Sequence, residues 1–228
     1  MNSLILVNSR HAYSQDTEQD LIPVYKDYPN ILLEREAAHA LSLIMEQLDG
    51  WRFIVPVSGW RSLEEQLTIY EESLQENGPE FTAKFVAMPG HSEHQTGLAV
   101  DLALKQPLID PIRPHFPYEG ICQLFREKAP QFGFIERYPD GRESITGIGH
   151  EPWHFRYVGI AHARIITKNR LTLEEYIEQI KAYPFGKRGL SYQGNGRHFT
   201  VSYQKASASG TTILETEDNV CCSVSGNN

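Results

Sequence analysis

The sequence is poor in residues that could hold a small domain together covalently. Three cysteines occur among 228 residues, Cys122 and the adjacent pair Cys221 and Cys222, and no C-x-x-C is present. An odd count with one vicinal pair does not form a disulfide framework. We therefore expect the cysteines to be reduced and structural.

Long apolar runs and an excess of basic residues are also missing. No window reaches the ~20 consecutive apolar residues that a membrane-spanning helix needs. The net charge of -8 argues against a nucleic-acid surface, which requires a basic patch. Residues 1–16 contain a short apolar run with no positive charge before it, unlike a secretion signal. We expect a cytoplasmic protein.

The hydrophobic fraction of 40% is enough for one domain with a substantial core. Apolar spacings of three and four, with Ser62/Glu65 and Thr172/Glu175 as capping boxes, predict helices over 31–48, 63–77, 121–132 and 173–183. The apolar face predicted for the second consists of Leu63, Leu67, Tyr70 and Leu74. Strands are predicted in 53–57, 97–104 and 153–158.

The order of these elements lacks a regular βαβ rhythm. We therefore predict an α+β fold, with a small, mainly antiparallel sheet and packed helices, over residues 1–186. Residues 187–228 have a different composition. They contain short strand-like pieces (LSYQGNGRHFTVSYQ, TTILET and VCCSV) divided by Gly, Ser and Asn clusters, and are predicted to be a β-rich C-terminal appendage.

Two short windows concentrate histidine. In PGHSEHQTGLAVD, His94 and Asp101 are seven residues apart, which on a helix would separate them by ~10.5 Å. A turn at Gly97 can instead bring them together, with Asp101 on the following strand. A carboxylate in an otherwise apolar strand needs a partner. That partner is either a metal ion shared with His94 or an arginine, and this window does not decide between them.

The second window, HEPWH at 150–154, matches the H-E-x-x-H zinc pattern literally. That pattern requires a helix, but Pro152 interrupts it and the β-rich WHFRYV follows. We predict instead that Glu151 is a general base and His154 a metal ligand. With His94 and Asp101 this gives three protein ligands and an open position, which is typical of catalytic zinc. His150 is then a residue at the rim of the site.

The segments S-x-H-x-x-G-x-A-x-D (92–101) and E-P-W-H (151–154) resemble the zinc-dependent D,D-peptidases. That family includes D-alanyl-D-alanine carboxypeptidases and the D-Ala-D-Ala dipeptidases of vancomycin resistance. The similarity covers roughly residues 1–183, including SGWRS at 58–62, GFIERYPDG, and RYVG followed by LTLEEY. It looks closest to the cytoplasmic resistance enzymes that combine both activities.

The resemblance implies one Zn²⁺ per chain at His94, Asp101 and His154, with Glu151 as catalytic base. It also implies a catalytic role for Arg61, although the residues alone favour an exposed arginine at this position. Ser92 and Gln66 match positions that bind substrate in the family. Trp153 is expected to pack beside the site.

The implied substrates are small peptides ending in D-Ala-D-Ala: the free dipeptide and the pentapeptide precursor of the cell wall. Hydrolysing both would remove the terminus that vancomycin binds. Four alternatives remain open: a D,D-carboxypeptidase only, an L,D-carboxypeptidase or an endopeptidase acting on muropeptides, and a catalytically silent zinc-binding module. The appendage is a candidate homodimer contact or a cover over the active site.

Overall fold

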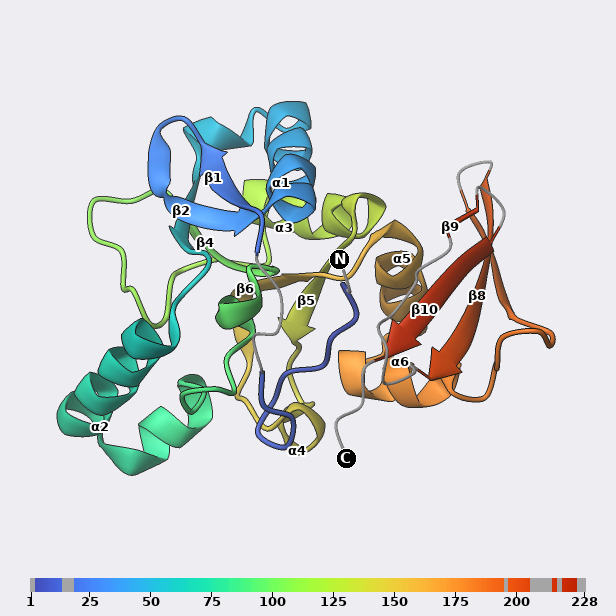
Figure 1. The fold of residues 1–228 in the computed structure, drawn as a ribbon. Coiled ribbons are helices and arrows are strands. Elements are labelled where there is room, and N and C mark those ends of the chain that lie inside the picture. The colour runs from blue at the N-terminus through green and yellow to red at the C-terminus, as the bar shows by residue number, and fades with distance from the viewer. Residues whose placement is uncertain (1–2, 14–18, 195–196, 206–214, 217–218, 225–228) are drawn as a thin grey trace.

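The computed structural model describes residues 3–13, 19–194, 197–205, 215–216 and 219–224 of the chain (Figure 1). Its centre is a four-stranded sheet in the order β3-β4-β6-β5, in which every neighbouring pair is antiparallel. The strands are β3 (Ile54–Ser58), β4 (Ala99–Leu104), β5 (Phe134–Tyr138) and β6 (Glu151–Tyr157). The predicted α+β fold with an antiparallel sheet is confirmed, although β5 was not predicted.

A hairpin that the sequence did not predict precedes the first helix. It joins β1 (Leu21–Tyr25) to β2 (Tyr28–Glu34), and α1 (Arg35–Gln47) follows directly. The prediction of a helix from residue 31 was therefore wrong at its start. Ile31–Leu33 are apolar in a helix-compatible spacing, but Leu32 and Leu33 pair with Pro23 and Ile22 of β1, so strand pairing prevails over the periodicity.

The helix α2 (Leu63–Phe85) begins at the predicted capping box, where Ser62 Oγ accepts from the Glu65 amide and Glu65 Oε2 accepts from the Ser62 amide. Gly78, at φ +80°, breaks the helical path as predicted, but a second helical segment continues after Pro79. At its far end α2 projects away from the sheet (Figure 1).

The face that α2 buries is polar. Its buried residues are Gln66, Ser73 and Thr82, whereas Leu63 and Leu67 are exposed. The predicted apolar face is thus not the buried one. The polar residues can be buried because they are hydrogen-bonded, Ser73 Oγ to Thr82 Oγ1 at 2.8 Å and Gln66 Nε2 to the Ala87 carbonyl at 2.7 Å.

The remaining helices of the described residues are shorter than α1 and α2. The predicted helix 121–132 is present as α3 and η3 and ends at Gly133, whose φ of +95° suits a glycine C-cap. The Thr172/Glu175 capping box also forms. The bounds are η1 (Gly50–Arg52), η2 (Glu93–Thr96), α3 (Gly120–Lys128), η3 (Ala129–Phe132), α4 (Glu143–Thr146), α5 (Ile160–Asn169) and α6 (Leu173–Ile180).

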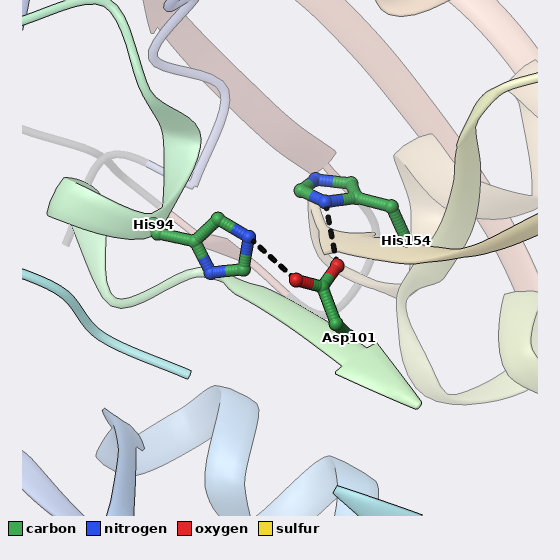
Figure 2. Close-up of side chains that lie close together, drawn as sticks. All are labelled: His94, Asp101 and His154. Atoms are coloured by element: carbon green, nitrogen blue, oxygen red, sulfur yellow. Dashed lines mark hydrogen bonds and ion pairs between the residues drawn. The ribbon is translucent and has the colours of Figure 1, made fainter. Parts of the chain in front are cut away.

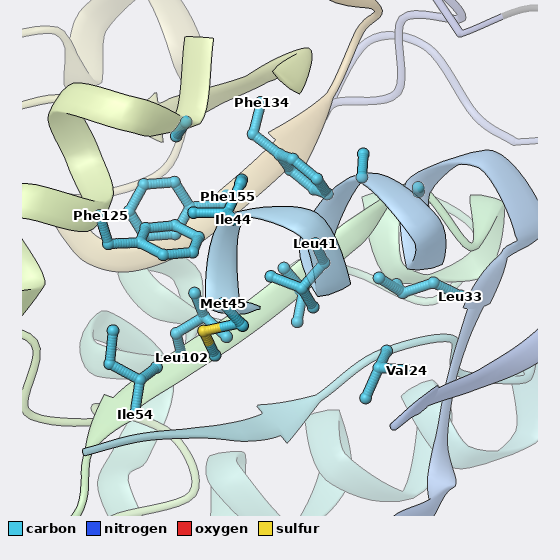
Figure 3. Close-up of a cluster of buried hydrophobic side chains, with 14 of the residues drawn as sticks. Val24, Leu33, Leu41, Ile44, Met45, Ile54, Leu102, Phe125, Phe134 and Phe155 are labelled. Atoms are coloured by element: carbon cyan, nitrogen blue, oxygen red, sulfur yellow. The ribbon is translucent and has the colours of Figure 1, made fainter. Parts of the chain in front are cut away.

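The main core lies between the sheet, α1 and α3 (Figure 3). Leu41, Ile44 and Met45 of α1 pack over Leu102 of β4 and Phe155 of β6. These side chains are removed from water. Because successive residues of a strand point to opposite faces, Asp101 and His154 project from the other face of the sheet. The packed core therefore fixes β4 and β6, the two strands that carry Asp101 and His154.

The C-terminal strands form a second sheet in the order β7-β8-β10-β9. Its strands are β7 (Leu190–Gly194), β8 (Arg197–Lys205), β9 (Glu215–Thr216) and β10 (Asn219–Val224). Tyr203 of β8 exchanges backbone hydrogen bonds with Tyr183 and Phe185, and Val201 packs into the cluster formed by α5 and α6. Most of the predicted piece TTILET, and the side chains of Cys221 and Cys222, lie outside what the structure describes.

Candidate metal centre and active site

Three buried side chains from separate elements converge on one point: His94 of η2, Asp101 of β4 and His154 of β6 (Figure 2). His94 Nε2 lies 3.1 Å from Asp101 Oδ2, and His154 Nδ1 lies 2.9 Å from Asp101 Oδ1. One ligand atom of each residue lies within 4.8 Å of the others. Atoms that each lie ~2 Å from a shared ion are at most ~4 Å apart, and the two contacts of Asp101, at 3.1 and 2.9 Å, already meet this limit.

The local sequence explains why these residues meet. Ser92 begins η2, with its Oγ accepting from the His94 amide at 3.4 Å, and Gly97 ends it at φ +70°. The chain therefore turns back after His94 and enters β4, as the sequence predicted for Gly97. Asp101 then lies directly opposite His154 in the register of β4 and β6.

Each histidine presents a single nitrogen to the cluster, because its other nitrogen has a partner. His94 Nδ1 lies 2.7 Å from the Gly59 carbonyl, which can only accept, so this nitrogen carries the proton and Nε2 is free as a ligand. His154 uses the opposite arrangement, with Nε2 near Glu93 Oε2 at 3.4 Å and Nδ1 toward Asp101. Such outer partners are usual for metal-binding histidines.

The electrostatics of the cluster also suit a cation. Burial alone would raise the pKa of Asp101, but His94 and His154 lower it well below the usual range. Burial would likewise lower the pKa of His154, yet hydrogen bonds to Asp101 and Glu93 raise it to about 9. Positive charge is thus favoured between these groups, and two imidazoles with one carboxylate are a donor set that zinc accepts.

Glu151 lies at the start of β6, three residues before His154, with Oε2 3.8 Å from His154 Nδ1. Burial raises the pKa of its carboxyl to about 8, and Asp101 adds to this while His154 opposes it. A divalent cation at the cluster would favour the ionised form. A buried carboxylate near the metal cluster is positioned to accept and return a proton.

Arg61 also points at this cluster, with Nη2 4.0 Å from Asp101 Oδ2. Its guanidinium donates to Gln66 Oε1 at 2.7 Å and to Ser58 Oγ at 2.8 Å. The side chain is 16% exposed, so it is not a surface arginine. Gln66 is oriented in turn by the Ala87 carbonyl, and it therefore holds Arg61 as well as facing the cavity.

The three residues of the metal cluster, together with Glu151 and Arg61, line a cavity of about 320 Å³. Ser92, Gln66 and Trp153 line it as well, and Ile69, Phe85, Ile112 and Ile148 give it apolar walls. Small-molecule sites commonly combine such walls with a few polar groups. Among the described residues, none after His154 lines the cavity. The described part of the appendage therefore does not cover the site.

His150 is separated from the metal cluster. Its Nε2 is 2.7 Å from Tyr118 Oη, the two rings stack, and its side chain is 29% exposed. Because residues 151–157 form a strand, the literal H-E-x-x-H match has no helix on which to operate.

Glu93 is a buried residue of the site that was not predicted. Glu93 lies beside His94 in the sequence, is fully buried and contacts His154. Burial alone would raise the pKa of Glu93, but Arg137 and Arg156 lower it well below its usual range. A glutamate between a serine and a histidine in a short polar window carries no sequence signal of such burial.

The part of the chain that carries the site residues also matches known proteins. Residues 30–160 match the family model described as VanY: D-alanyl-D-alanine carboxypeptidase. The bifunctional D-Ala-D-Ala dipeptidase and D-Ala-D-Ala carboxypeptidase VanXYC of Enterococcus gallinarum is 41% identical over 179 residues, which are 77% of this chain and 94% of that protein. Among the described residues, no helix is both long and apolar enough to cross a membrane.

Two solved structures are similar in fold. The vancomycin resistance D,D-dipeptidase VanXYg, in complex with a D-Ala-D-Ala phosphinate analog, is 49% identical with a TM-score of 0.84, covering 86% of this chain and 78% of that one. A variant of the vancomycin resistance D,D-pentapeptidase VanY in complex with Zn(II) is 30% identical with a TM-score of 0.66, covering 78% of this chain and 99% of that one.

Proposed function

The chain belongs to the VanY family of D-alanyl-D-alanine carboxypeptidases, and from this premise we propose that it hydrolyses both D-Ala-D-Ala and the terminal D-Ala of cell-wall pentapeptide precursors. One observation carries the proposal: the His94–Asp101–His154 cluster, Glu151 and Arg61 line one cavity. The relative VanXYC, which bears both activities in its name, is 41% identical to this chain. The proposed role of the present chain is likewise in vancomycin resistance.

The proposed cofactor is one Zn²⁺ held by His94 Nε2, an oxygen of Asp101 and His154 Nδ1. Bound there, it would activate a water molecule and polarise the scissile carbonyl. The support is the fit of the donor set, together with the Zn(II) complex of the VanY relative. Three protein ligands leave a coordination position open for chemistry.

The chain's own residues perform the proton transfers. The Glu151 carboxylate accepts a proton from the attacking water and delivers it to the leaving amine. The Arg61 guanidinium, fixed by Ser58 and Gln66, donates to the negative oxygen that develops on the carbonyl carbon. Ser92 and Gln66 face the same cavity and are proposed to contact the peptide.

The proposed compartment is the cytoplasm, where free D-Ala-D-Ala and the soluble precursor are found. Cell fractionation with immunodetection tests it, and recovery of a processed protein outside the membrane would contradict it. The proposed division of the chain keeps residues 187–228 as an appendage that affects oligomeric state or substrate range. Sedimentation of the full chain tests the homodimer, which requires twice the mass of 26.0 kDa.

The experiment that tests the function is D-alanine release by the zinc-loaded protein, measured separately from D-Ala-D-Ala and from the pentapeptide precursor. Chelator-sensitive release from both is expected. Release from the pentapeptide alone would assign a D,D-carboxypeptidase. A third substrate, a muropeptide tetrapeptide ending in an L,D bond, tests the L,D-carboxypeptidase alternative, and cross-linked muropeptides test the endopeptidase. With zinc bound, no release from any of them would indicate a silent module.

A further inference from the structure

Glu93 occupies the centre of a buried network of charges behind the metal cluster. Its side chain has no exposed surface, and its two oxygens have different partners. Oε1 accepts from Arg137 Nε at 2.8 Å and from Arg156 Nη1 at 2.7 Å. Oε2 lies 3.4 Å from His154 Nε2. One oxygen therefore accepts hydrogen bonds from two arginines, and the other faces His154, a candidate metal ligand.

The two arginines are themselves fixed, so Glu93 cannot easily turn. Arg137 donates through both terminal nitrogens to Glu174 of α6, at 2.9 and 2.7 Å. Arg156 Nη2 donates to the backbone carbonyls of Ser3 and Ile5, at 3.2 and 2.7 Å. Both guanidinium side chains are fully buried. Bidentate arginine pairs of this kind fix orientation as well as charge.

We propose that Glu93 is a positioning residue that keeps the proton of His154 on Nε2 and so leaves Nδ1 available to the metal. This inference rests on the proposed zinc site. His94 needs no such residue because the Gly59 backbone carbonyl already binds its Nδ1. His154 presents the opposite nitrogen to Asp101, and its outer partner is a side chain that mutation can change.

The substitution Glu93→Gln isolates this role because it preserves the shape of the side chain. The single oxygen of glutamine would be retained by the two arginine donors, which leaves its NH₂ group facing His154 Nε2. An NH₂ group only donates, so Nε2 would have to accept and the proton would move to Nδ1. A protonated Nδ1 cannot bind a metal ion. Zinc binding should suffer more than folding.

Glu174→Gln is the matched control. Glu174 binds the same Arg137, and also Asn8 Nδ2 at 3.0 Å, but no contact between Glu174 and His154 is found among the described residues. Both substitutions remove one negative charge from the buried network. Any effect that arises merely from weakening the network should appear in both variants, whereas an effect on His154 should appear only in Glu93→Gln.

The test measures zinc affinity by competition with a chelator, together with urea unfolding of the metal-free proteins. We expect Glu93→Gln to bind zinc about 10–100-fold more weakly than the wild type. Glu174→Gln should keep the wild-type affinity while losing stability. Equal zinc affinity in all three proteins would overturn the proposal and leave Glu93 a purely structural residue, and so would an equal loss in both variants.

A second measurement needs no variant. Heteronuclear NMR of the zinc-loaded wild type with nitrogen-labelled histidine reports which nitrogen of His154 carries a proton. A proton on Nε2, protected from exchange, is expected. A proton on Nδ1, or a metal-bound Nε2, would overturn the positioning role while leaving the proposed function intact. Failure of the wild type to bind zinc at all would overturn both.

Discussion

His154 and Asp101 are register partners on the adjacent antiparallel strands β6 and β4, and His154 Nδ1 lies 2.9 Å from Asp101 Oδ1. Residues directly opposite in an antiparallel pair have their Cβ atoms about 4.5–5.5 Å apart. The sheet register alone therefore brings these two ligand candidates together. A slip of one residue would turn one of the side chains to the other face of the sheet.

The first prediction separates the two histidines of HEPWH. His154→Ala should remove zinc and activity, because it deletes one of three ligands from a buried cluster. His150→Ala should retain one zinc per chain, because that ring stacks on Tyr118 instead. Metal content after dialysis and D-alanine release check both. Zinc loss in His150→Ala with zinc retained in His154→Ala would restore the helical motif and refute this site.

The second prediction concerns the general base. Glu151→Gln keeps the size of the side chain but cannot accept a proton, so kcat should fall by about 10²–10⁴-fold. Zinc content should be unchanged because Glu151 is not a member of the ligand cluster. Steady-state kinetics with parallel metal analysis test this. A variant with full zinc and wild-type kcat would exclude Glu151 as the base.

The third prediction concerns the guanidinium of Arg61, which makes hydrogen bonds to two side chains at once. A lysine ammonium cannot reach Ser58 Oγ and Gln66 Oε1 in the planar arrangement that the guanidinium uses. Arg61→Lys should therefore lower kcat by about 10²–10³-fold, as expected for loss of an oxyanion donor. Arg52→Lys is the control, because Arg52 is 70% exposed and its guanidinium contacts Asp49 and the ring of Phe53, not the site. Equal kcat in both variants would argue against a catalytic Arg61.

Much of the site could be predicted because its signals are local. The turn at Gly97, the lone charge in an apolar strand and the proline in HEPWH each lie within a few residues of the group that they position. Capping boxes are equally local, and both form. Roles assigned to Arg61, Gln66 and Ser92 came from the family resemblance and stay predictions.

What could not be predicted depends on partners far away in the chain. Glu93 is buried because Arg137 of β5 and Arg156 of β6 bind its carboxylate. Both arginines are far from Glu93 in the sequence, so the residues around Glu93 give no sign of them. The start of the helix predicted at residue 31 was wrong for the same reason, because residues 31–34 belong to β2, for which β1 supplies the strand partner. The buried face of α2 was misassigned because hydrogen bonding, not apolarity, decides which side of it faces the protein.

The fourth prediction tests the turn that joins His94 to Asp101. An alanine Cβ at Gly97 would lie 2.8 Å from Leu21 Cδ2 and 3.2 Å from the Glu34 amide nitrogen, at a φ of +70°. Gly141→Ala is a matched control, since its φ is +73° and nothing lies within 4 Å of the added Cβ. Both should lose about 1 kcal/mol from the left-handed backbone, and Gly97→Ala should lose more because of the clash. Equal unfolding midpoints in urea would show that the β1–β2 hairpin shifts enough to accommodate the added methyl group without cost.

The fifth prediction concerns pH and stability. Burial lowers the pKa of His162 from 6.5 to about 4, and its Nδ1 lies 2.6 Å from Tyr176 Oη. Between these two values the unfolded chain binds a proton that the folded chain does not, so stability falls as the pH falls from 6.5 toward 4. Above 6.5 the contribution of His162 to stability is fully present.

His162→Gln isolates this effect because glutamine can still hydrogen-bond to Tyr176 but does not titrate. The variant should be less stable than the wild type at neutral pH, since it leaves a less well packed side chain beside the ring of Tyr176. The difference should shrink by about 2 kcal/mol on going to about pH 5, because only the wild type must then expel a proton to fold. Titrating groups that the two proteins share cancel in this comparison when they are far from the substitution. Urea unfolding at both pH values measures it, and a difference that stays constant would mean that His162 titrates equally in the folded and unfolded chains.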